Sequence, residues 1–162
     1  MHMNSKATPI EHTTFSDYFD GVSSNEVYQL DKEEANFLWV SNIDDKAKSY
    51  FDLPDENWLV EGSETQLGDW QRAYNEGDNE SVASVLESSF GWIDNNSIFF
   101  CISKDLILRC TWKIFLEHWD SFVAAEDDCP IIFSEHGEDS AALIIMAIGD
   151  ICRIDRKGQR EE

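Results

Sequence analysis

Hydrophobic and polar positions alternate most regularly over residues 97–110. In SIFFCI (97–102) the side chains of Ile98, Phe100 and Ile102 fall on one face of an extended chain, and LILRC (106–110) alternates in the same way. The three polar residues between the two runs favour a reversal of the chain. The pattern therefore predicts a β-hairpin over residues 97–110.

A helical period replaces this alternation after Thr111, whose side chain is suited to capping a helix. Apolar side chains then recur at spacings of three and four residues, at Trp112, Phe115, Leu116, Trp119, Phe122 and Val123. The apolar runs PIIF (130–133), ALIIMAI (142–148) and ICRI (151–154) follow, and Gly149-Asp150 fits a two-residue hairpin turn. Residues 97–155 are thus predicted to follow the order β-β-α-β-β-β.

The N-terminal half holds two predicted helices separated by a long connection. Asp31 is expected to cap a helix that extends to about residue 47, with Glu34 completing a capping box. Residues 80–90 (ESVASVLESSF) carry apolar side chains at helical spacing and predict the second helix. The connection over residues 51–80 is acidic and rich in Gly and Asn, and residues 58–60 predict a short strand within it.

One α+β domain accounts for these elements, because 162 residues fit a single domain. We expect a mostly antiparallel sheet, built largely from residues 97–155, with two or three helices packed on it. Residues 27–156 form this domain in our interpretation. Residues 1–26 are polar and aperiodic, which predicts a loosely ordered N-terminal segment, and residues 157–162 are expected to form a solvated tail.

The net charge of −21, from 33 acidic and 12 basic residues, narrows the range of partners. The acids are spread along the chain: residues 1–100 carry −15 (20 acids, 5 bases) and residues 101–162 carry −6 (13 acids, 7 bases). Such a charge repels nucleic acids and anionic membranes. In the simplest interpretation it serves solubility, and in a more specific one it steers the protein to a basic protein partner.

Sequence motifs for catalysis, metal binding and phosphate binding are missing. The chain has no GxSxG, GxGxxG or GxxxxGK[ST] pattern, and Cys101, Cys110, Cys129 and Cys152 show no CxxC spacing. We therefore expect no enzyme activity, no cofactor and no metal. The isolated cysteines, with no signal peptide and no apolar segment of about 18 residues, predict a cytoplasmic protein with reduced thiols.

Acidic clusters supply the candidate contact residues. Glu126, Asp127 and Asp128 directly follow a predicted helix, where the helix dipole disfavours negative charge, so local stability does not explain them. They are our first choice for contacts with a basic partner. The second choice, with Trp70 as an aromatic anchor near it, is the cluster of Glu76, Asp78 and Glu80. The alternatives are a solvated loop for the first cluster and, for Trp70, an aromatic that only pins the connection to the domain.

Two motifs resemble those of a small, acidic bacterial family of unknown function. They are GWxDxxxxFFC (91–101) and WxxFxxxWxxF (112–122), and the resemblance extends over about residues 28–155. It implies a compact α+β domain and assigns no activity.

By type, the chain is also similar to the immunity proteins of contact-dependent growth inhibition and other polymorphic toxin systems. The similarity lies in size, acidity, aromatic content and lack of motifs, and it implies a cytoplasmic protein that neutralises a cognate toxin. We therefore expect an immunity protein that occludes the active site of a cationic toxin, an RNase or DNase. The alternative is an acidic housekeeping or adaptor domain without a toxin partner.

Overall fold

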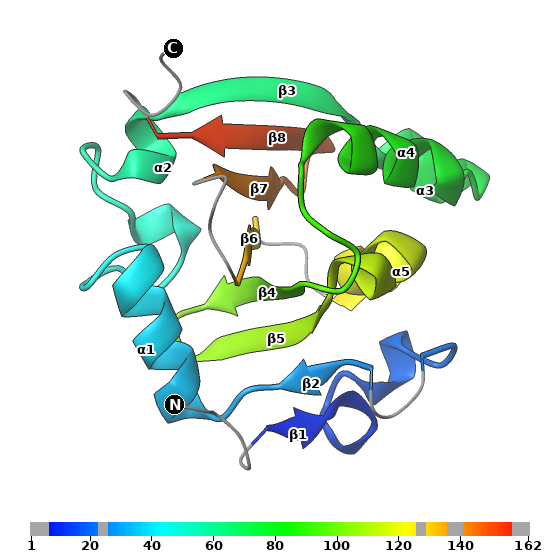
Figure 1. Cartoon of the computed structure of the whole chain (residues 1–162), viewed down its shortest axis with the longest axis horizontal. Helices are drawn as coiled ribbons and strands as arrows, with labels where there is room; N and C mark the ends of the chain where they lie inside the picture. Colours follow the sequence, from blue (N-terminus) through cyan, green and yellow to red (C-terminus); the bar gives the residue numbers. More distant parts are fainter. Residues whose placement is uncertain (1–6, 23–25, 126–128, 136–140, 157–162) are drawn as a thin grey trace.

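Eight β-strands form one antiparallel sheet in the computed structural model, which describes residues 7–22, 26–125, 129–135 and 141–156. Their order is β1-β2-β5-β4-β6-β7-β8-β3, so β1 and β3 are the edges (Figure 1). The strands are β1 (Thr8–Pro9), β2 (Tyr28–Gln29), β3 (Ser63–Asp69), β4 (Ser97–Ser103), β5 (Leu106–Thr111), β6 (Ile131–Ser134), β7 (Ala141–Ile145) and β8 (Asp150–Asp155). The expected α+β domain with a mostly antiparallel sheet is confirmed.

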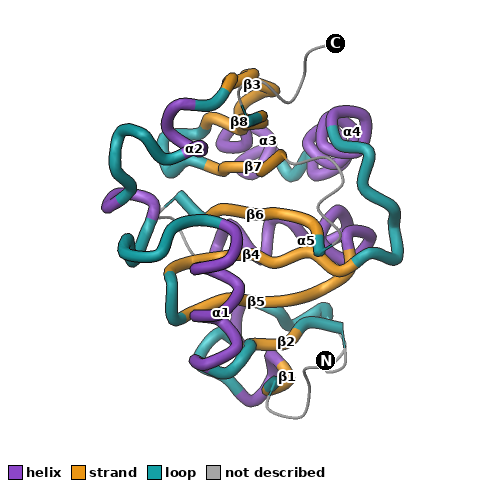
Figure 2. Tube along the Cα trace, turned by 60° about the vertical axis from the view of Figure 1, so that its left-hand side comes forward, coloured by secondary structure: helices purple, strands orange, loops and turns teal. Residues whose placement is uncertain are grey.

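Helices cover both faces of this sheet. On one face lie α1 (Lys32–Asn42) and α2 (Trp58–Glu61), and on the other lie α3 (Trp70–Glu76), α4 (Asn79–Ser89) and α5 (Trp112–Ala125), as Figures 1 and 2 show. Alternate side chains of β4 therefore enter two different hydrophobic clusters, Phe100 on the side of α5 and Phe99 on the side of α1. The described residues hold five α-helices where two or three were expected, because α2 and α3 are too short to show a helical period.

The C-terminal half follows the predicted order β-β-α-β-β-β. Strands β4 and β5 pair as a hairpin, and the chain reverses at Lys104 and Asp105. The Oγ1 atom of Thr111 accepts a hydrogen bond from the backbone N–H of Ile114 (3.2 Å), which confirms the cap of α5. The predicted apolar stripe of α5 packs against the sheet, with Trp112, Phe115, Trp119, Phe122 and Val123 buried.

The β7–β8 hairpin turns two residues earlier than predicted. The backbone N–H of Gly149 donates to the carbonyl of Met146 (2.9 Å), so Ala147 and Ile148 are the central residues of the turn. Gly149 itself follows with φ +117°, a conformation that favours glycine. A side chain at this position would also come within 2.7 Å of the Asp69 carboxylate. The prediction of a Gly149-Asp150 turn was therefore wrong, because this glycine serves the exit from the turn.

The N-terminal half confirms one predicted cap and corrects one helix boundary and one predicted strand. The Asp31 carboxylate accepts a hydrogen bond from the backbone N–H of Glu34 (2.9 Å), and α1 ends at Asn42, before the expected end near residue 47. The second predicted helix is α4. The strand predicted at residues 58–60 was wrong: these residues belong to α2, which is capped by the Asn57 side chain.

Residues 7–22 differ from the loosely ordered segment expected for the N-terminus. They form β1 and the short 3-10 helices η1 (Ile10–His12) and η2 (Ser16–Tyr18). Ile10, Phe19 and Val22 are buried in the core cluster on the side of α5, and the rings of Phe19 and Phe122 lie 4.9 Å apart. Three separated apolar residues thus anchor a polar stretch to the domain. The expected tail at residues 157–162 lies outside the described residues.

A buried ion pair joins β8 to α4. The Arg153 guanidinium donates from Nε and Nη2 to the Asp155 carboxylate (3.1 and 3.0 Å), and its Nη1 donates to the carbonyl of Ser89 (2.6 Å). Its charged group also lies 5.1 Å from the centre of the Phe90 ring. Asp155 is almost fully buried, so each charge depends on its partner for compensation.

Removing one member of this pair is expected to destabilise the fold strongly. The variant Asp155→Ala removes the carboxylate from the largely buried Arg153 guanidinium. The loss is expected to lower the free energy of unfolding by about 3–5 kcal/mol. The double variant Arg153→Met/Asp155→Ala removes both charges and is expected to recover part of that loss. Urea unfolding monitored by tryptophan fluorescence measures both, and a single variant as stable as the wild type would contradict the assignment.

Candidate protein-interaction surfaces

Three of the predicted acidic contacts meet where α3 passes into α4. The Asp69 side chain caps α3, and the helix ends at Gly77, whose φ of +73° lets the chain reverse. The second helix, α4, begins two residues later. The reversal brings together the predicted contacts Glu76, Asp78 and Glu80, which are all exposed.

The β7–β8 turn is braced against the start of α3. The indole Nε1 of Trp70 donates to the carbonyl of Met146 (2.7 Å), and Nε2 of Gln71 donates to the carbonyl of Ala147 (2.8 Å). These bonds hold Ile148 outward with 73% of its surface exposed, the largest value among the exposed large apolar residues described. Such central turn positions are usually occupied by Gly, Asn, Asp, Ser or Pro, so a fixed and exposed isoleucine is unusual there.

We use the name α3–α4 corner for the exposed residues Tyr74, Glu76, Asp78 and Glu80, together with Ile148, whose turn is bonded to the first two residues of α3. Tyr74 is 41% exposed and supplies a second apolar contact. The centre of its ring lies 5.8 Å from that of Trp70 and 6.4 Å from that of Trp119, so Tyr74 packs against two buried tryptophans. Rigid apolar side chains beside carboxylates are the arrangement that combines affinity with electrostatic steering.

Trp70 has a different place from the one expected of an anchor. Only 9% of its surface is exposed, because the indole lies in the core cluster beneath Tyr74. The residue therefore supports the corner by holding the β7–β8 turn, and it leaves little surface for a partner. The exposed aromatic and aliphatic residues of the corner are instead Tyr74 and Ile148.

The first-choice acids Glu126, Asp127 and Asp128 lie outside the described residues. The chain leaves α5 immediately before them, and α5 runs antiparallel to α4. Trp112, at the start of α5, packs 6.1 Å from Phe90 at the end of α4, while the indole of Trp119 donates to the carbonyl of Asn79 at the start of α4 (3.0 Å). The described part of α5 thus ends on the side of the helical layer where the α3–α4 corner lies.

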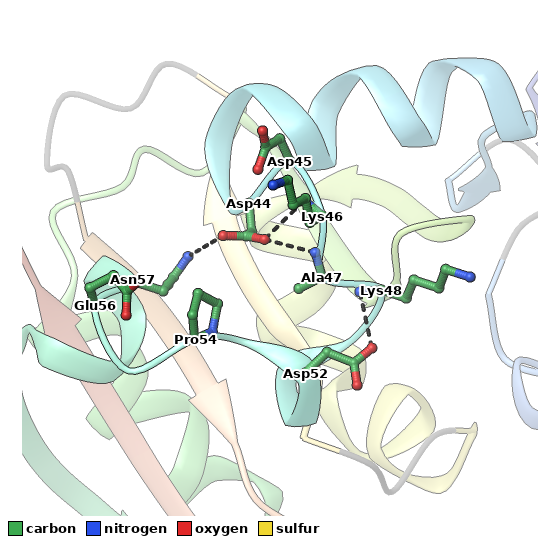
Figure 3. A pocket seen from close by; sticks show the side chains of 9 residues that line it. All are labelled: Asp44, Asp45, Lys46, Ala47, Lys48, Asp52, Pro54, Glu56 and Asn57. Atoms are coloured by element: carbon green, nitrogen blue, oxygen red, sulfur yellow. Dashed lines mark hydrogen bonds between the residues drawn. The ribbon is translucent and has the colours of Figure 1, made fainter.

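A hollow of about 780 Å³ lies on the other face of the sheet, between the end of α1 and α2 (Figure 3). It is lined by Asp44, Asp45, Lys46, Ala47, Lys48, Asp52, Pro54, Glu56 and Asn57. The carboxylate of Asp44 accepts hydrogen bonds from the backbone N–H groups of Ala47 (2.7 Å) and Lys46 (3.0 Å). These bonds hold the pKa of Asp44 below its usual value, because they favour the charged form.

Buried side chains fix this loop to the core. Asn57 donates from Nδ2 to the carbonyl of Ile43 (2.7 Å) and accepts at Oδ1 from the backbone N–H of Leu59 (2.8 Å). The indole of Trp39 donates to the carbonyl of Ala47 (2.8 Å), and that of Trp58 donates to the carbonyl of Asn42 (3.1 Å). A segment without regular structure is thus held in one shape.

We call the outward surface of residues 32–61, which include α1, the 3-10 helix η3 (Tyr50–Asp52), α2 and the connections between them, the α1–α2 face. It exposes the apolar residues Phe37, Val40, Phe51 and Val60. The sequence analysis missed this surface, because it gave Phe37, Val40 and Phe51 no role and placed Val60 in a predicted strand. A signal for it in the sequence is Phe51, an aromatic residue followed closely by Asp52, Asp55 and Glu56.

We searched the described residues for a reactive cysteine and for a group of metal ligands. Burial raises the pKa of the Cys101 and Cys110 thiols well above the usual range. Burial and a hydrogen bond to Glu64 (3.4 Å) raise the pKa of Cys152 to about 12. These thiols stay protonated at neutral pH, which opposes a nucleophilic role. Within the described ranges, no three His, Cys, Asp or Glu side chains are grouped to hold a metal ion.

The fold and composition define an acidic α+β domain. A family model described as "Protein of unknown function (DUF2947)" matches residues 19–146, so the chain belongs to this family. The comparisons with curated proteins and with solved structures gave no match. No helix in the described part of the chain is long and apolar enough to cross a membrane. The family description assigns no activity, so a functional proposal depends on the chain's own residues.

The hydrogen bonds of Asp44 predict how the stability of the α1–α2 face depends on pH. Because the folded state lowers the pKa of Asp44, its stabilising effect is complete above the unfolded value of about 4 and is lost as the pH falls through the folded value. The variant Asp44→Asn is therefore expected to be less stable than the wild type at pH 7, with a difference that shrinks toward pH 3. Urea unfolding at several pH values measures this. Asp45→Asn, at the exposed neighbouring residue, is the control, and an equal loss in both variants would contradict the role of Asp44.

Proposed function

We propose that this protein is an immunity protein that binds a cationic toxin and covers the toxin's active site. The toxin is a nuclease, an RNase or DNase, whose phosphate-binding Lys and Arg side chains face the carboxylates of the immunity protein. In this proposal the complex forms in the cytoplasm of the producing cell. The observation that carries it is the α3–α4 corner, where a turn bonded to the start of α3 exposes Ile148, and where α3 and its connection to α4 expose Tyr74 and three carboxylates.

The charge of the corner suits a basic partner. Glu76, Asp78 and Glu80 are exposed within one reversal of the chain, and Arg72 lies 3.7 Å from Glu76 on the surface. Exposed ion pairs of this kind contribute little, so Arg72 offsets only part of the local field. A cluster of like charges at one place accelerates association with an oppositely charged surface about 10- to 1000-fold.

The apolar side chains of the corner supply what charge alone does not. Contacts that exclude water determine the dissociation rate, while peripheral charges mainly set the association rate. Hydrogen bonds to the carbonyls of Met146, Ala147 and Gly149 hold the backbone around Ile148 in place. The turn therefore loses little conformational freedom when a partner binds. A preorganised contact of this kind raises affinity by lowering the entropic cost of association.

Neutralisation of a nuclease domain encoded beside this protein's gene is the direct test. Co-expression is expected to restore growth to cells that produce the nuclease domain, and the purified proteins are expected to form a 1:1 complex. An acidic housekeeping or adaptor domain would give neither result. Failure to bind any toxin domain encoded beside the gene would contradict the immunity function.

Charge reversal at the corner is expected to slow association with that toxin. The variant Glu76→Lys/Asp78→Lys/Glu80→Lys should lower the association rate about tenfold at low salt and flatten its salt dependence. Stopped-flow mixing at several salt concentrations measures both effects. The matched control is Asp45→Lys/Asp55→Lys/Glu56→Lys, which makes the same change of net charge on the α1–α2 face. An equal loss in both variants would show that total charge, and not the corner, steers the toxin. Reversal of Glu126, Asp127 and Asp128 tests the first-choice cluster in the same assay.

Loss of the apolar contact is expected to act on dissociation instead. The variant Ile148→Ser should raise the dissociation rate about tenfold and leave the association rate almost unchanged, because it removes a central apolar contact and no charge. Surface plasmon resonance with the immobilised toxin measures the two rates. Ile93→Ser is the matched control, since Ile93 is an isoleucine of similar exposure (65%) in a different loop. Identical rates for both variants would place the interface elsewhere.

A further inference from the structure

Exposed apolar side chains are concentrated on the α1–α2 face. The described residues include eight exposed large apolar side chains, and four of them, Phe37, Val40, Phe51 and Val60, come from α1, η3 and α2. Figures 1 and 2 place these three elements on the same side of the sheet. Phe37 and Phe51 are 66% and 67% exposed. Several exposed apolar side chains on one side of a folded domain are more than the single ones that surfaces commonly carry.

The outward side of α1 is an apolar pair between acids. Ala35 and Trp39 of this helix are fully buried, so Phe37 and Val40, three residues apart, lie together on the opposite side. Glu33 lies one turn before Phe37 on the helix, and the exposed Asp45 follows the helix end in the connection after Asn42. The pair therefore has a carboxylate one turn before it and acids in the connection beyond the helix end.

The remainder of the face is also acidic and is held rigidly. Its carboxylates outnumber its cations, which are Lys32, Lys46 and Lys48 together with Arg156, whose guanidinium lies 3.9 Å from the centre of the Trp58 ring in α2. The carboxylates are Glu33, Asp44, Asp45, Asp52, Asp55, Glu56 and Glu61. One of these lysines, Lys32, already lies 3.9 Å from Asp105 of the β4–β5 turn. The Asn57 and Trp39 hydrogen bonds fix the loop around the hollow, so little order must be created when a partner binds.

We infer that the α1–α2 face is a second docking surface, and that its occupant is a basic amphipathic helix of another protein. An exposed helix with an apolar stripe packs against the apolar stripe of a second helix through interlocking side chains. With 11 residues α1 is about 16 Å long, so a partner helix of about three turns covers it. Lys or Arg at the two ends of that helix meets the acids beyond Phe37 and Val40.

The charge of the α1–α2 face favours a basic helix over a second copy of the chain and over an anionic membrane. A second copy of the chain would place carboxylates opposite carboxylates, because an antiparallel pair of α1 helices brings Glu33 of one copy near Asp44 of the other. An anionic membrane is repelled by the same acids. A basic helix removes both difficulties.

The second surface does not depend on the α3–α4 corner. The two lie on opposite faces of the sheet, with the hydrophobic core between them, so one partner bound at the corner leaves α1 exposed. Variants at each surface therefore report on one proposal without disturbing the other.

Binding of a synthetic helix to the full chain tests the inference. The probe is an amphipathic peptide of about 16–18 residues, built from Leu and Lys at helical spacing, and the reference is a scrambled peptide of the same composition. Calorimetry is expected to show binding of the amphipathic peptide at least about tenfold tighter than that of the scrambled one. Equal affinity for the two peptides would show that charge alone attracts them, which overturns the proposal.

Paired variants assign that binding to the face. Phe37→Ser/Val40→Ser is expected to lower the affinity for the amphipathic peptide about tenfold, and Asp45→Lys/Asp55→Lys/Glu56→Lys is expected to weaken it and reduce its salt dependence. Ile148→Ser and Ile93→Ser should change the affinity less than about twofold. Thermal unfolding checks that the exposed substitutions leave the fold intact, and Phe37→Glu provides a second disruptive variant.

Other outcomes would overturn the assignment of the occupant. Self-association of the wild type in analytical ultracentrifugation that is lost in Phe37→Ser/Val40→Ser would identify a second copy as the occupant. Binding to zwitterionic vesicles that is lost in the same variant would identify a lipid surface. An effect of Ile148→Ser as large as that of Phe37→Ser/Val40→Ser would place peptide binding at the α3–α4 corner. Failure of the toxin assays, by contrast, would leave the peptide result unaffected.

Discussion

The burial of the central strands on both faces is the constraint from which the rest of the molecule follows. Side chains of β4, β6 and β7 are buried alternately under α5 and under α1, so these strands leave no face for charge. A net charge of −21 must then be carried by loops, helix exteriors and sheet edges. Asp155 is the exception among the described acids, and its buried charge is paired with that of Arg153. The two-sided core thus creates an anionic exterior and provides the apolar burial that opposes its self-repulsion.

Elements that contribute many side chains to this core were predictable from sequence. The stripe of α5 and the alternation of β4 and β5 each place several apolar residues on one face. The helical period and the two-residue period can therefore be recognised in the sequence. Strand β3 shows no such period, because it is an edge strand with mainly exposed side chains and is defined by backbone pairing with β8. The N-terminal stretch was missed for a related reason. Ile10 and Phe19 bury themselves singly between polar residues, and two isolated apolar positions define no period.

The residues of the candidate surfaces also differ in how well the sequence predicted them. Acidic residues are recognisable in a sequence because charge keeps them outside, and Glu76, Asp78 and Glu80 are indeed exposed. Exposed apolar residues are not recognisable in this way, since Phe37 and Val40 stand among apolar neighbours in the same helix as the buried Trp39. Ile148 was hidden by the turn prediction, which used the glycine at position 149 as a turn residue and left Ile148 in a strand. The exposed apolar residues that the sequence analysis missed are therefore those on which the two proposed surfaces depend.

Screening determines how far the acidity of one surface affects the other. At physiological ionic strength the field of an exposed charge decays over about 8 Å, which is less than the thickness of a helix layer packed on a sheet. The α3–α4 corner and the α1–α2 face are separated by the sheet and its helices, so each presents its own local carboxylates to a partner. The net charge of −21 therefore does not act on a partner as one undivided field. In the proposed complexes the local clusters of acids supply the steering, and the apolar side chains near them supply the affinity.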